Sequence, residues 1–359
     1  MKKIILSIVM FFLFTITVSA MNINSSSFIA MDINSGRVFY EKNKDNKRLI
    51  ASTTKIMTAI VAIENSNMED LIEAKEEVLT MYGSNIYIEY HEHMLMLDLL
   101  YGLMLRSGND ASVVIATHVS GSIEKFVSLM NEKAKELGMT NTIFKNPHGL
   151  DEESENYSTA YDLSILYSYA YKNEIFRKIV GTKRYKLTTE VKAYDWYNRN
   201  KILTMYDKAT GGKTGYTPKA GKVLVTSASN NDLDIVITSF NSIYDYDLHA
   251  KVYEDIFYNY SNTLILDKNN FNLKNNPFDG VLYIKDSVYY PLSNSEKNKI
   301  TKLVNFYNLK KYNNGDEVGE VYLYLDDDII STAKIYIKKN DKTLYEKIKD
   351  FLHSIKIFN

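Results

Sequence analysis

Strand-like segments stand on both sides of a long helical stretch, and this arrangement most constrains the fold of the chain. Residues 28–33 and 37–41 are short apolar runs separated by Asn34-Ser35-Gly36, which is a hairpin turn signal. Residues 222–229 and 233–240 form a second such pair around a polar turn. The stretch between the pairs carries apolar residues at helical spacing in 94–105, 111–118 and 123–137. We therefore predict an α+β fold in which the two pairs join in one antiparallel sheet flanked by helices.

A chain of 359 residues, 45% of them hydrophobic, has room for one large domain and a smaller one. The pattern changes near Thr263 to short apolar runs at 281–284, 320–325 and 329–337, broken by Asn, Asp and Gly clusters. These runs predict a β-rich second domain. We expect the first domain to span residues 21–262 and the second to span residues 263–340.

The first twenty residues have the pattern of a secretory signal peptide. Lys2 and Lys3 precede an apolar run from Ile4 to Thr17, and small residues ending at Ala20 suit a signal peptidase. A membrane anchor is the alternative, but the run has about fourteen residues where a bilayer span needs roughly twenty. We therefore expect export to the outer face of the membrane or to the cell wall.

The last segment, residues 341–359, has the pattern of an amphipathic helix. Lysines occupy the other faces of this helix. This pattern suits a helix on a membrane surface, and a tail helix packed on its own domain has the same pattern. The apolar residues at helical spacing are Leu344, Ile348, Phe351, Leu352, Ile355 and Phe358.

The charge balance and the lack of cysteine exclude several classes of function. A formal net charge of -1 gives no field that would recruit nucleic acid. Without cysteine the chain has no disulfide, no thiol nucleophile and no thiolate metal site. His148 lacks partners at ligand spacing, so we expect no metal and no cofactor. We assign His148 instead to a turn beneath the reactive site.

Three short motifs stand in order along the chain: Ser52-Thr53-Thr54-Lys55, Ser107-Gly108-Asn109 and Lys213-Thr214-Gly215. Each motif alone is common by chance. Their order, on a predicted helix, loop and strand, is specific and indicates one reactive site.

The first motif pairs a nucleophile with a base. Residues three apart on a helix face the same side, so the Lys55 amine can reach the Ser52 hydroxyl. A serine hydroxyl needs a base to remove its proton before it can attack. No histidine lies near this motif, so Lys55 is the candidate base. A free lysine has a pKa of about 10.4, so a pKa near 7 requires roughly 4.6 kcal/mol in favour of the neutral amine. Burial and a second cation, Lys213, are expected to supply this energy.

The other motifs supply groups that orient the substrate and transfer protons. Ser107 has a hydroxyl suited to passing a proton to the leaving amine, and the Asn109 amide suits a substrate backbone. Gly215 permits close approach to the strand edge, where a peptide binds as an added strand. The backbone N–H groups of Ser52 and Tyr216 are candidates for an oxyanion hole.

Several stretches resemble the D-alanyl-D-alanine carboxypeptidase family. The resemblance covers residues 27–260 and implies a five-stranded antiparallel sheet flanked by helices. In place of the family's common proline and histidine, Ile50 precedes the first motif and Tyr216 follows the third. The matching stretches are ASTTKIMT (51–58), LDLLYGLMLRSGNDA (97–111), NPHGL (146–150), YSTAYDL (157–163) and GKTGYTPKA (212–220).

The resemblance also implies roles for individual residues. Ser52 would be the acylated nucleophile and Lys55 its proton acceptor, while Ser107 would relay a proton. Lys213, with Thr214 beside it in the motif, would bind the substrate carboxylate. In Asn198-Arg199-Asn200, Arg199 would help to bind that carboxylate, although a surface arginine is the alternative.

This resemblance implies removal of the terminal D-alanine from peptidoglycan stem peptides, with β-lactams as covalent inhibitors. A serine β-lactamase would use the same motifs, but the sequence lacks the E-x-x-L-N segment that commonly supplies the deacylation base. A wall-binding or sporulation scaffold without turnover is a further alternative. The retention of all the reactive side chains argues against a scaffold.

Overall fold

The computed structural model describes residues 21–243 and 245–339. The predicted signal peptide (1–20) and the predicted terminal helix (341–359) lie outside these described residues.

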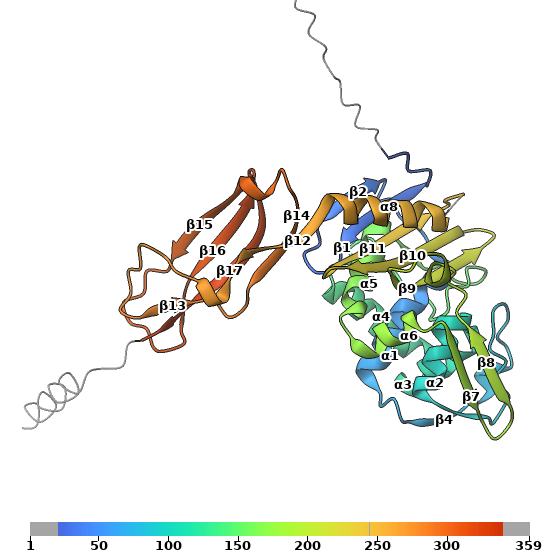
Figure 1. Cartoon of the computed structure of the whole chain (residues 1–359). Coiled ribbons are helices and arrows are strands. Elements are labelled where there is room, and N and C mark those ends of the chain that lie inside the picture. Colours follow the sequence, from blue (N-terminus) through green and yellow to red (C-terminus); the bar gives the residue numbers. More distant parts are fainter. Residues whose placement is uncertain (1–20, 244, 340–359) are drawn as a thin grey trace, which may run out of the picture.

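A five-stranded antiparallel sheet forms the centre of the larger domain, in the order β2-β1-β11-β10-β9 (Figure 1). Strand β1 lies between its hairpin partner β2 and the distant β11, with Ile29 opposite Thr238. The predicted joining of the two strand pairs in one sheet is confirmed. The bounds are β1 Ser27–Asp32, β2 Val38–Lys42, β9 Ala209–Thr217, β10 Gly221–Asn230 and β11 Leu233–Phe240.

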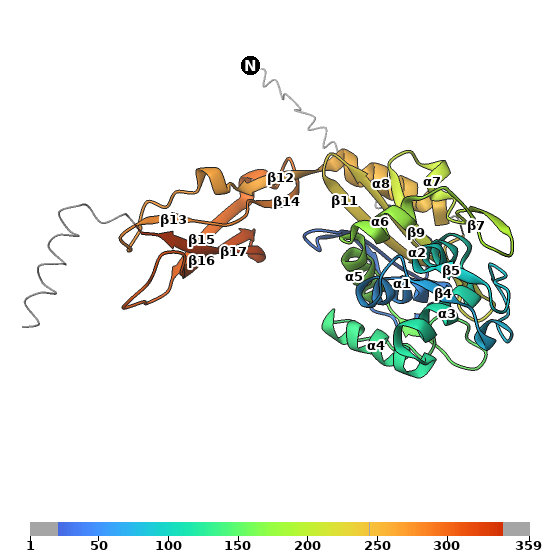
Figure 2. The same ribbon diagram turned by 90° about the horizontal axis from the view of Figure 1, so that it is seen from below.

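Helices cover both faces of this sheet, as Figure 2 shows from below. Successive side chains of a strand point to opposite faces. Ile29 and Met31 of β1 pack in the core shared with the helices of the middle segment, whereas Phe28 and Ala30 pack towards helix α8 (Asp245–Asn259). This explains why β1 is an unbroken apolar run, because a strand buried on both faces does not alternate with polar residues.

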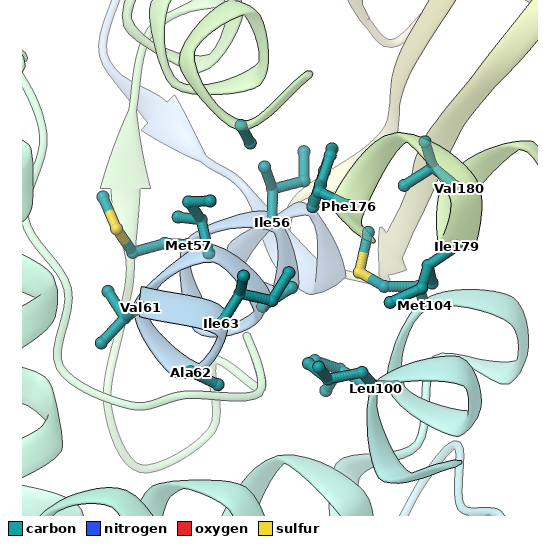
Figure 3. Packing of buried hydrophobic residues seen from close by; sticks show 14 of the residues in the cluster. Ile56, Met57, Val61, Ala62, Ile63, Leu100, Met104, Phe176, Ile179 and Val180 are labelled. Carbon is teal, nitrogen blue, oxygen red and sulfur yellow. The ribbon is translucent and has the colours of Figure 1, made fainter. Parts of the chain in front are cut away.

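Helix α1 (Lys55–Asn65) runs through the middle of the helical part and is buried on nearly every side. Figure 3 shows Ile56, Met57 and Val61 of α1 among side chains of the surrounding helices. Burying each side chain of this size contributes about 1.5–3 kcal/mol, so the helix that begins with Lys55 is rigidly held. The other helical segments are η1 Ala51–Thr54, η2 Glu76–Val78, α2 Met96–Tyr101, the π-helical turn η3 Gly102–Arg106, α3 Asn109–Ser120, α4 Ile123–Glu136, α5 Ala160–Tyr171, α6 Glu174–Gly181 and α7 Ile202–Met205.

Three short antiparallel strand pairs lie in the helical part of the domain. The predicted helix over 94–105 begins only at Met96, because β5 pairs with β4 just before it. The hairpin β7–β8 is a further element that the helical pattern did not predict. The pairs are β3 Arg48–Leu49 with β6 Tyr157–Ser158, β4 Leu71–Glu73 with β5 His93–Leu95, and β7 Arg184–Thr188 with β8 Ala193–Tyr197.

The second domain is β-rich, as predicted. A two-stranded and a four-stranded sheet, the latter in the order β13-β17-β16-β15, enclose a separate core that includes Leu292, Leu323 and Ile335. The bounds are β12 Tyr260–Leu266, η4 Lys268–Asn270, β13 Val281–Tyr283, β14 Val288–Ser293, η5 Lys297–Lys299, β15 Ile300–Phe306, β16 Glu317–Leu325 and β17 Asp328–Lys338.

Arg37, in the β1–β2 turn, joins the two domains. Its guanidinium donates to the Pro291 carbonyl at 2.6 Å and forms an ion pair with Glu296, also at 2.6 Å. The same guanidinium lies over the rings of Tyr260 and Tyr290, at 4.9 and 5.5 Å from their centroids. A bidentate, half-buried pair of this kind has fixed geometry, so it holds the second domain against the sheet.

Within residues 21–243 and 245–339, no single helix has the length and apolar character needed to cross a membrane. The pair α3 and α4, bent by 86°, meets these criteria of length and composition only when both helices are counted together.

Candidate active site

Ser52 and Lys55 stand at the junction of a 3₁₀ turn and helix α1. Ser52 lies in η1 and Lys55 is the first residue of α1. Side chains three apart are eclipsed in a 3₁₀ turn, and the Lys55 Nζ lies 3.2 Å from the Ser52 Oγ. The predicted approach of Lys55 to Ser52 is therefore present, although the turn is 3₁₀ rather than α-helical. Ala51 before it has a φ of 45°, a left-handed conformation that is uncommon for a residue with a side chain.

Two oxygen atoms besides the Ser52 hydroxyl surround the Lys55 amine. Its Nζ lies 2.7 Å from the Asn109 Oδ1 and 2.5 Å from the His148 carbonyl. The Asn109 Nδ2 donates to the Tyr82 carbonyl at 2.7 Å, which fixes the orientation of this amide. Both oxygens facing Lys55 can therefore only accept. A neutral amine has two N–H bonds for them and one lone pair, which remains for the Ser52 O–H.

The electrostatic surroundings favour that neutral amine. Lys55 is fully buried, and burial lowers its pKa well below the ordinary value of 10.5. The positive charge of Lys213 lowers it further, Arg199 adds a smaller effect in the same direction, and Asp110 opposes them. Burial, and then the charge of Arg199, lowers the pKa of Lys213 to about 7. Both lysines therefore lose their protons far more readily than exposed lysines.

The Lys213 side chain connects the third motif to the second. Its Nζ donates to the Ser107 Oγ at 3.1 Å and to the Thr214 carbonyl at 2.8 Å. Ser107 ends the π-helical turn and has a φ of 64°. This left-handed residue separates the turn from helix α3, which begins two residues later. The two hydroxyl–lysine pairs thus lie in one site, with Asn109 two residues beyond Ser107 contacting Lys55.

Strand β9, which carries Lys213, Thr214, Gly215 and Tyr216, is the edge strand of the sheet. A Cβ atom at Gly215 would lie 3.1 Å from the backbone nitrogens of Ser52 and Thr53, so this strand passes directly against the turn that holds Ser52. Tyr216 follows and is 67% exposed. A cavity of about 480 Å³ adjoins Thr214, Gly215 and Tyr216, but its other lining residues lie on or beside α7, β10 and α8, and neither Ser52 nor Lys55 lines it.

Arg199 belongs to the same site. Its backbone N–H donates to the Leu105 carbonyl at 3.1 Å, and its Nη1 donates to the Ser84 Oγ at 2.8 Å. Burial and the neighbouring Arg106 lower the pKa of Arg199, and its positive charge acts on Lys213. The structure thus brings this guanidinium beside the site instead of leaving it on a separate surface.

Sequence reasoning missed the backbone part of the site. The His148 carbonyl is a partner of Lys55, and the Pro147 carbonyl accepts from the Thr58 hydroxyl at 2.6 Å. The buried amide of Asn156 joins this turn to the nucleophile turn, through the Thr54 Oγ1 at 3.0 Å and the Asn146 carbonyl at 2.9 Å. The turn lies under the site, where His148 was expected. Only the NPHGL resemblance signalled it.

This combination of motifs on a five-stranded antiparallel sheet defines a protein of the penicillin-binding class. Residues 14–243 match the family model described as D-alanyl-D-alanine carboxypeptidase, and the chain belongs to this family. Residues 272–343 match a second model, described as the C-terminal domain of penicillin-binding protein 5.

Among curated proteins, the chain is similar to D-alanyl-D-alanine carboxypeptidase DacF of Bacillus subtilis, with 37% identity over 234 residues. This match covers 64% of the chain and 60% of the relative. DacC of Escherichia coli is 33% identical over 232 residues, covering 61% of the chain and 57% of that relative. The chain thus spans about three fifths of the length of these relatives.

Solved structures support the architecture. The structure of penicillin binding protein 5 from Haemophilus influenzae aligns with a TM-score of 0.76, covering 90% of the chain and 99% of that structure. At 24% identity, this likeness concerns the fold. The D-alanyl-D-alanine carboxypeptidase structure from Mycobacterium tuberculosis has 28% identity and a TM-score of 0.63, covering 66% of the chain and 91% of that structure.

Proposed function

We propose that this protein is a serine-type D-alanyl-D-alanine carboxypeptidase that removes the terminal D-alanine from peptidoglycan stem peptides. The observation that carries the proposal is the Lys55 amine, 3.2 Å from the Ser52 Oγ with its other two partners both acceptors. A buried neutral amine in that position is a general base for the serine.

The reaction begins when the Ser52 Oγ attacks the carbonyl carbon of the penultimate D-alanine and Lys55 takes the hydroxyl proton. The backbone N–H groups of Ser52 and Tyr216 stabilise the negative oxygen of the tetrahedral intermediate. When the peptide C–N bond breaks, the leaving nitrogen receives a proton through Ser107, and D-alanine departs. Water then hydrolyses the Ser52 ester and releases the shortened stem.

Substrate binding follows from charge and from the free edge of β9. The stem peptide adds as a strand beside Gly215, with the Asn109 amide orienting its backbone. Lys213, Thr214 and Arg199 bind the terminal carboxylate. This contact restores the positive charge on Lys213, since a nearby anion favours the protonated amine. β-Lactams, which carry a carboxylate beside a reactive amide, acylate the same serine.

One experiment tests this function against the two alternatives. Purified protein is incubated with a labelled penicillin and, separately, with a peptide ending in D-alanyl-D-alanine. A persistent adduct together with release of D-alanine supports the carboxypeptidase. Rapid turnover of the penicillin would identify a β-lactamase, and an adduct without D-alanine release would favour a scaffold.

Serine variants make the result specific to the site. Ser52→Ala should abolish both the adduct and the release of D-alanine. Ser128→Ala, on the exposed side of α4, is the matched control and should retain both. An adduct of normal yield on Ser52→Ala would overturn the assignment of the nucleophile.

We propose further that the protein works outside the cytoplasm and that its last helix lies on the membrane surface. The supporting observations are the pattern of residues 1–20 and the amphipathic pattern of residues 341–359. A mature protein that begins at Met21, and that leaves the membrane fraction when residues 341–359 are deleted, is the expected result. An unprocessed cytoplasmic protein would refute the first part, and unchanged membrane association would refute the second.

A further inference from the structure

Asp110 is a buried carboxylate beside the site that the proposed mechanism does not use. It stands in the first turn of α3 and is 2% exposed. Its oxygens accept backbone N–H groups from three consecutive residues, at 3.0 Å from Ile86, 2.7 Å from Tyr87 and 3.1 Å from Ile88. It also accepts from the Ala111 N–H at 2.9 Å. A single carboxylate thus anchors a whole loop segment.

The anchored segment in turn holds two residues of the site. Ser84 lies two residues before Ile86, and its Oγ accepts from the Arg199 Nη1 at 2.8 Å. The Ser84 carbonyl accepts from the Asn109 N–H at 2.7 Å. Because Arg199 and Asn109 both depend on this loop, its position sets theirs.

Asp110 also acts on the base through its charge. The groups that act on Lys55 come from several elements: Lys213 on β9, Arg199 after β8 and Asp110 on α3. His148, in the turn below, has its pKa lowered to about 3 by burial and then by Lys55, so it is neutral near pH 7. Among these described groups, Asp110 carries the negative charge that opposes the two cations.

We propose that Asp110 is a positioning residue for acylation, because it fixes the loop that presents Arg199 to the substrate carboxylate and places a buried carboxylate next to Asn109, which contacts Lys55. This inference rests on the proposed function. It assigns Asp110 no contact with the substrate.

Asp110→Asn is the first test, with benzylpenicillin acylation measured across pH. An asparagine has one carbonyl oxygen, so some of the four backbone N–H groups lose their acceptor. The acylation efficiency should fall about tenfold through the displaced guanidinium. Acylation requires neutral Lys55, so its rate rises with pH through the pKa of that amine. Loss of the Asp110 charge lowers this pKa, and the displacement of Arg199 raises it by a smaller amount, so the acid limb of the profile should move to lower pH.

The acid limb of the acylation profile separates the proposed role of Asp110 from a merely structural one. A merely structural loss in Asp110→Asn would lower the rate at every pH without moving this limb. Asp32→Asn is the matched control: Asp32 is equally buried and accepts from Ser35, on the far hairpin. Its profile should equal that of the wild type. An unmoved limb in folded Asp110→Asn would overturn the electrostatic part of the inference.

Ser84→Ala tests the link to Arg199 even if Asp110→Asn fails to fold. It should slow acylation by benzylpenicillin about tenfold and leave its methyl ester, which lacks the carboxylate, nearly unaffected; Ser84→Thr should restore the rate. Equal rates for wild type and Ser84→Ala would overturn the loop's role. If wild-type protein forms no adduct, the proposed function itself fails, whereas a normal wild-type adduct with unaffected variants refutes this inference alone.

Discussion

Replacing Lys213 by methionine should stabilise the larger domain at low pH while abolishing acylation. In the folded chain the pKa of Lys213 is lowered from 10.5 to about 7, first by burial and then by Arg199. Below pH 7 the lysine is charged in both the folded and unfolded states, and the folded state carries a penalty of about 5 kcal/mol. Between pH 7 and 10.5 the unfolded chain binds more protons, so stability rises with pH and the penalty disappears.

The net effect on stability follows from this penalty and from the contacts that are lost. Methionine has a similar volume and no charge, but it loses the bonds to the Ser107 hydroxyl and the Thr214 carbonyl, each worth about 1 kcal/mol. At pH 6 the variant should be about 3 kcal/mol more stable than the wild type, within the range known for apolar replacement of buried ions. At pH 9 the remaining penalty of about 2 kcal/mol offsets the lost bonds, so the difference should be near zero.

Urea unfolding at both pH values measures this difference. The single tryptophan, Trp196, lies buried in β8 and therefore reports on the larger domain. Lys125→Met, on the exposed face of α4, is the control, and its effect should be the same at both pH values. A Lys213→Met variant that is less stable than the wild type at pH 6, or that shows an equal difference at pH 6 and pH 9, would refute the reasoning.

Two further substitutions test the surroundings of the site, and a third tests the junction between the domains. Gly149→Ala places a Cβ 2.0 Å from the Ala51 carbonyl at a φ of 90°, so penicillin acylation should fall at least about a hundredfold; Gly138→Ala, with a similar φ of 72° and open space, should acylate normally and cost only about 1 kcal/mol in thermal stability. Asn156→Ala leaves buried backbone N–H groups without an acceptor and should cost about 3 kcal/mol, measured by thermal unfolding. Arg37→Ala should leave acylation unchanged but speed hydrogen exchange in β12 and β14, and unchanged exchange would show that the guanidinium does not hold the domains together.

The part of the site made by side chains could be predicted from short motifs. The spacing of Ser52 and Lys55 fixes their distance through local helical geometry. The strand that carries Lys213 was expected from the Lys213-Thr214-Gly215 motif, and the structure places it at the sheet edge. The sheet itself followed from the hairpin at one end and the strand pair at the other. The contact of Lys55 with Ser52 and the two strand pairs are local patterns that each depend on a few neighbouring residues, whereas the joining of the pairs in one sheet was inferred from their need to share a core.

The backbone part of the site could not be predicted in the same way. The His148 carbonyl is chemically the same as any other carbonyl, so its contact with Lys55 depends on a chain path set by the whole fold. The hydrogen bonds to Asp110 depend equally on the fold, because their donors lie in a loop 22 to 24 residues earlier in the chain. The β7–β8 hairpin did carry a signal, since Tyr194 and Trp196 alternate with exposed residues, but its turn lacks the glycine that usually marks a tight hairpin.

Besides its proposed role as the base, the Lys55 amine connects three segments of the chain. It ties the nucleophile turn, the start of α3 and the turn at His148 to one atom. Deleting it would release three chain segments at once, so the kinetic loss in a Lys55 variant would combine lost proton transfer with lost architecture. Replacements at Ser52 remove only one of these three contacts and leave those with Asn109 and the His148 carbonyl, so they give the cleaner measure of what the chemistry alone contributes.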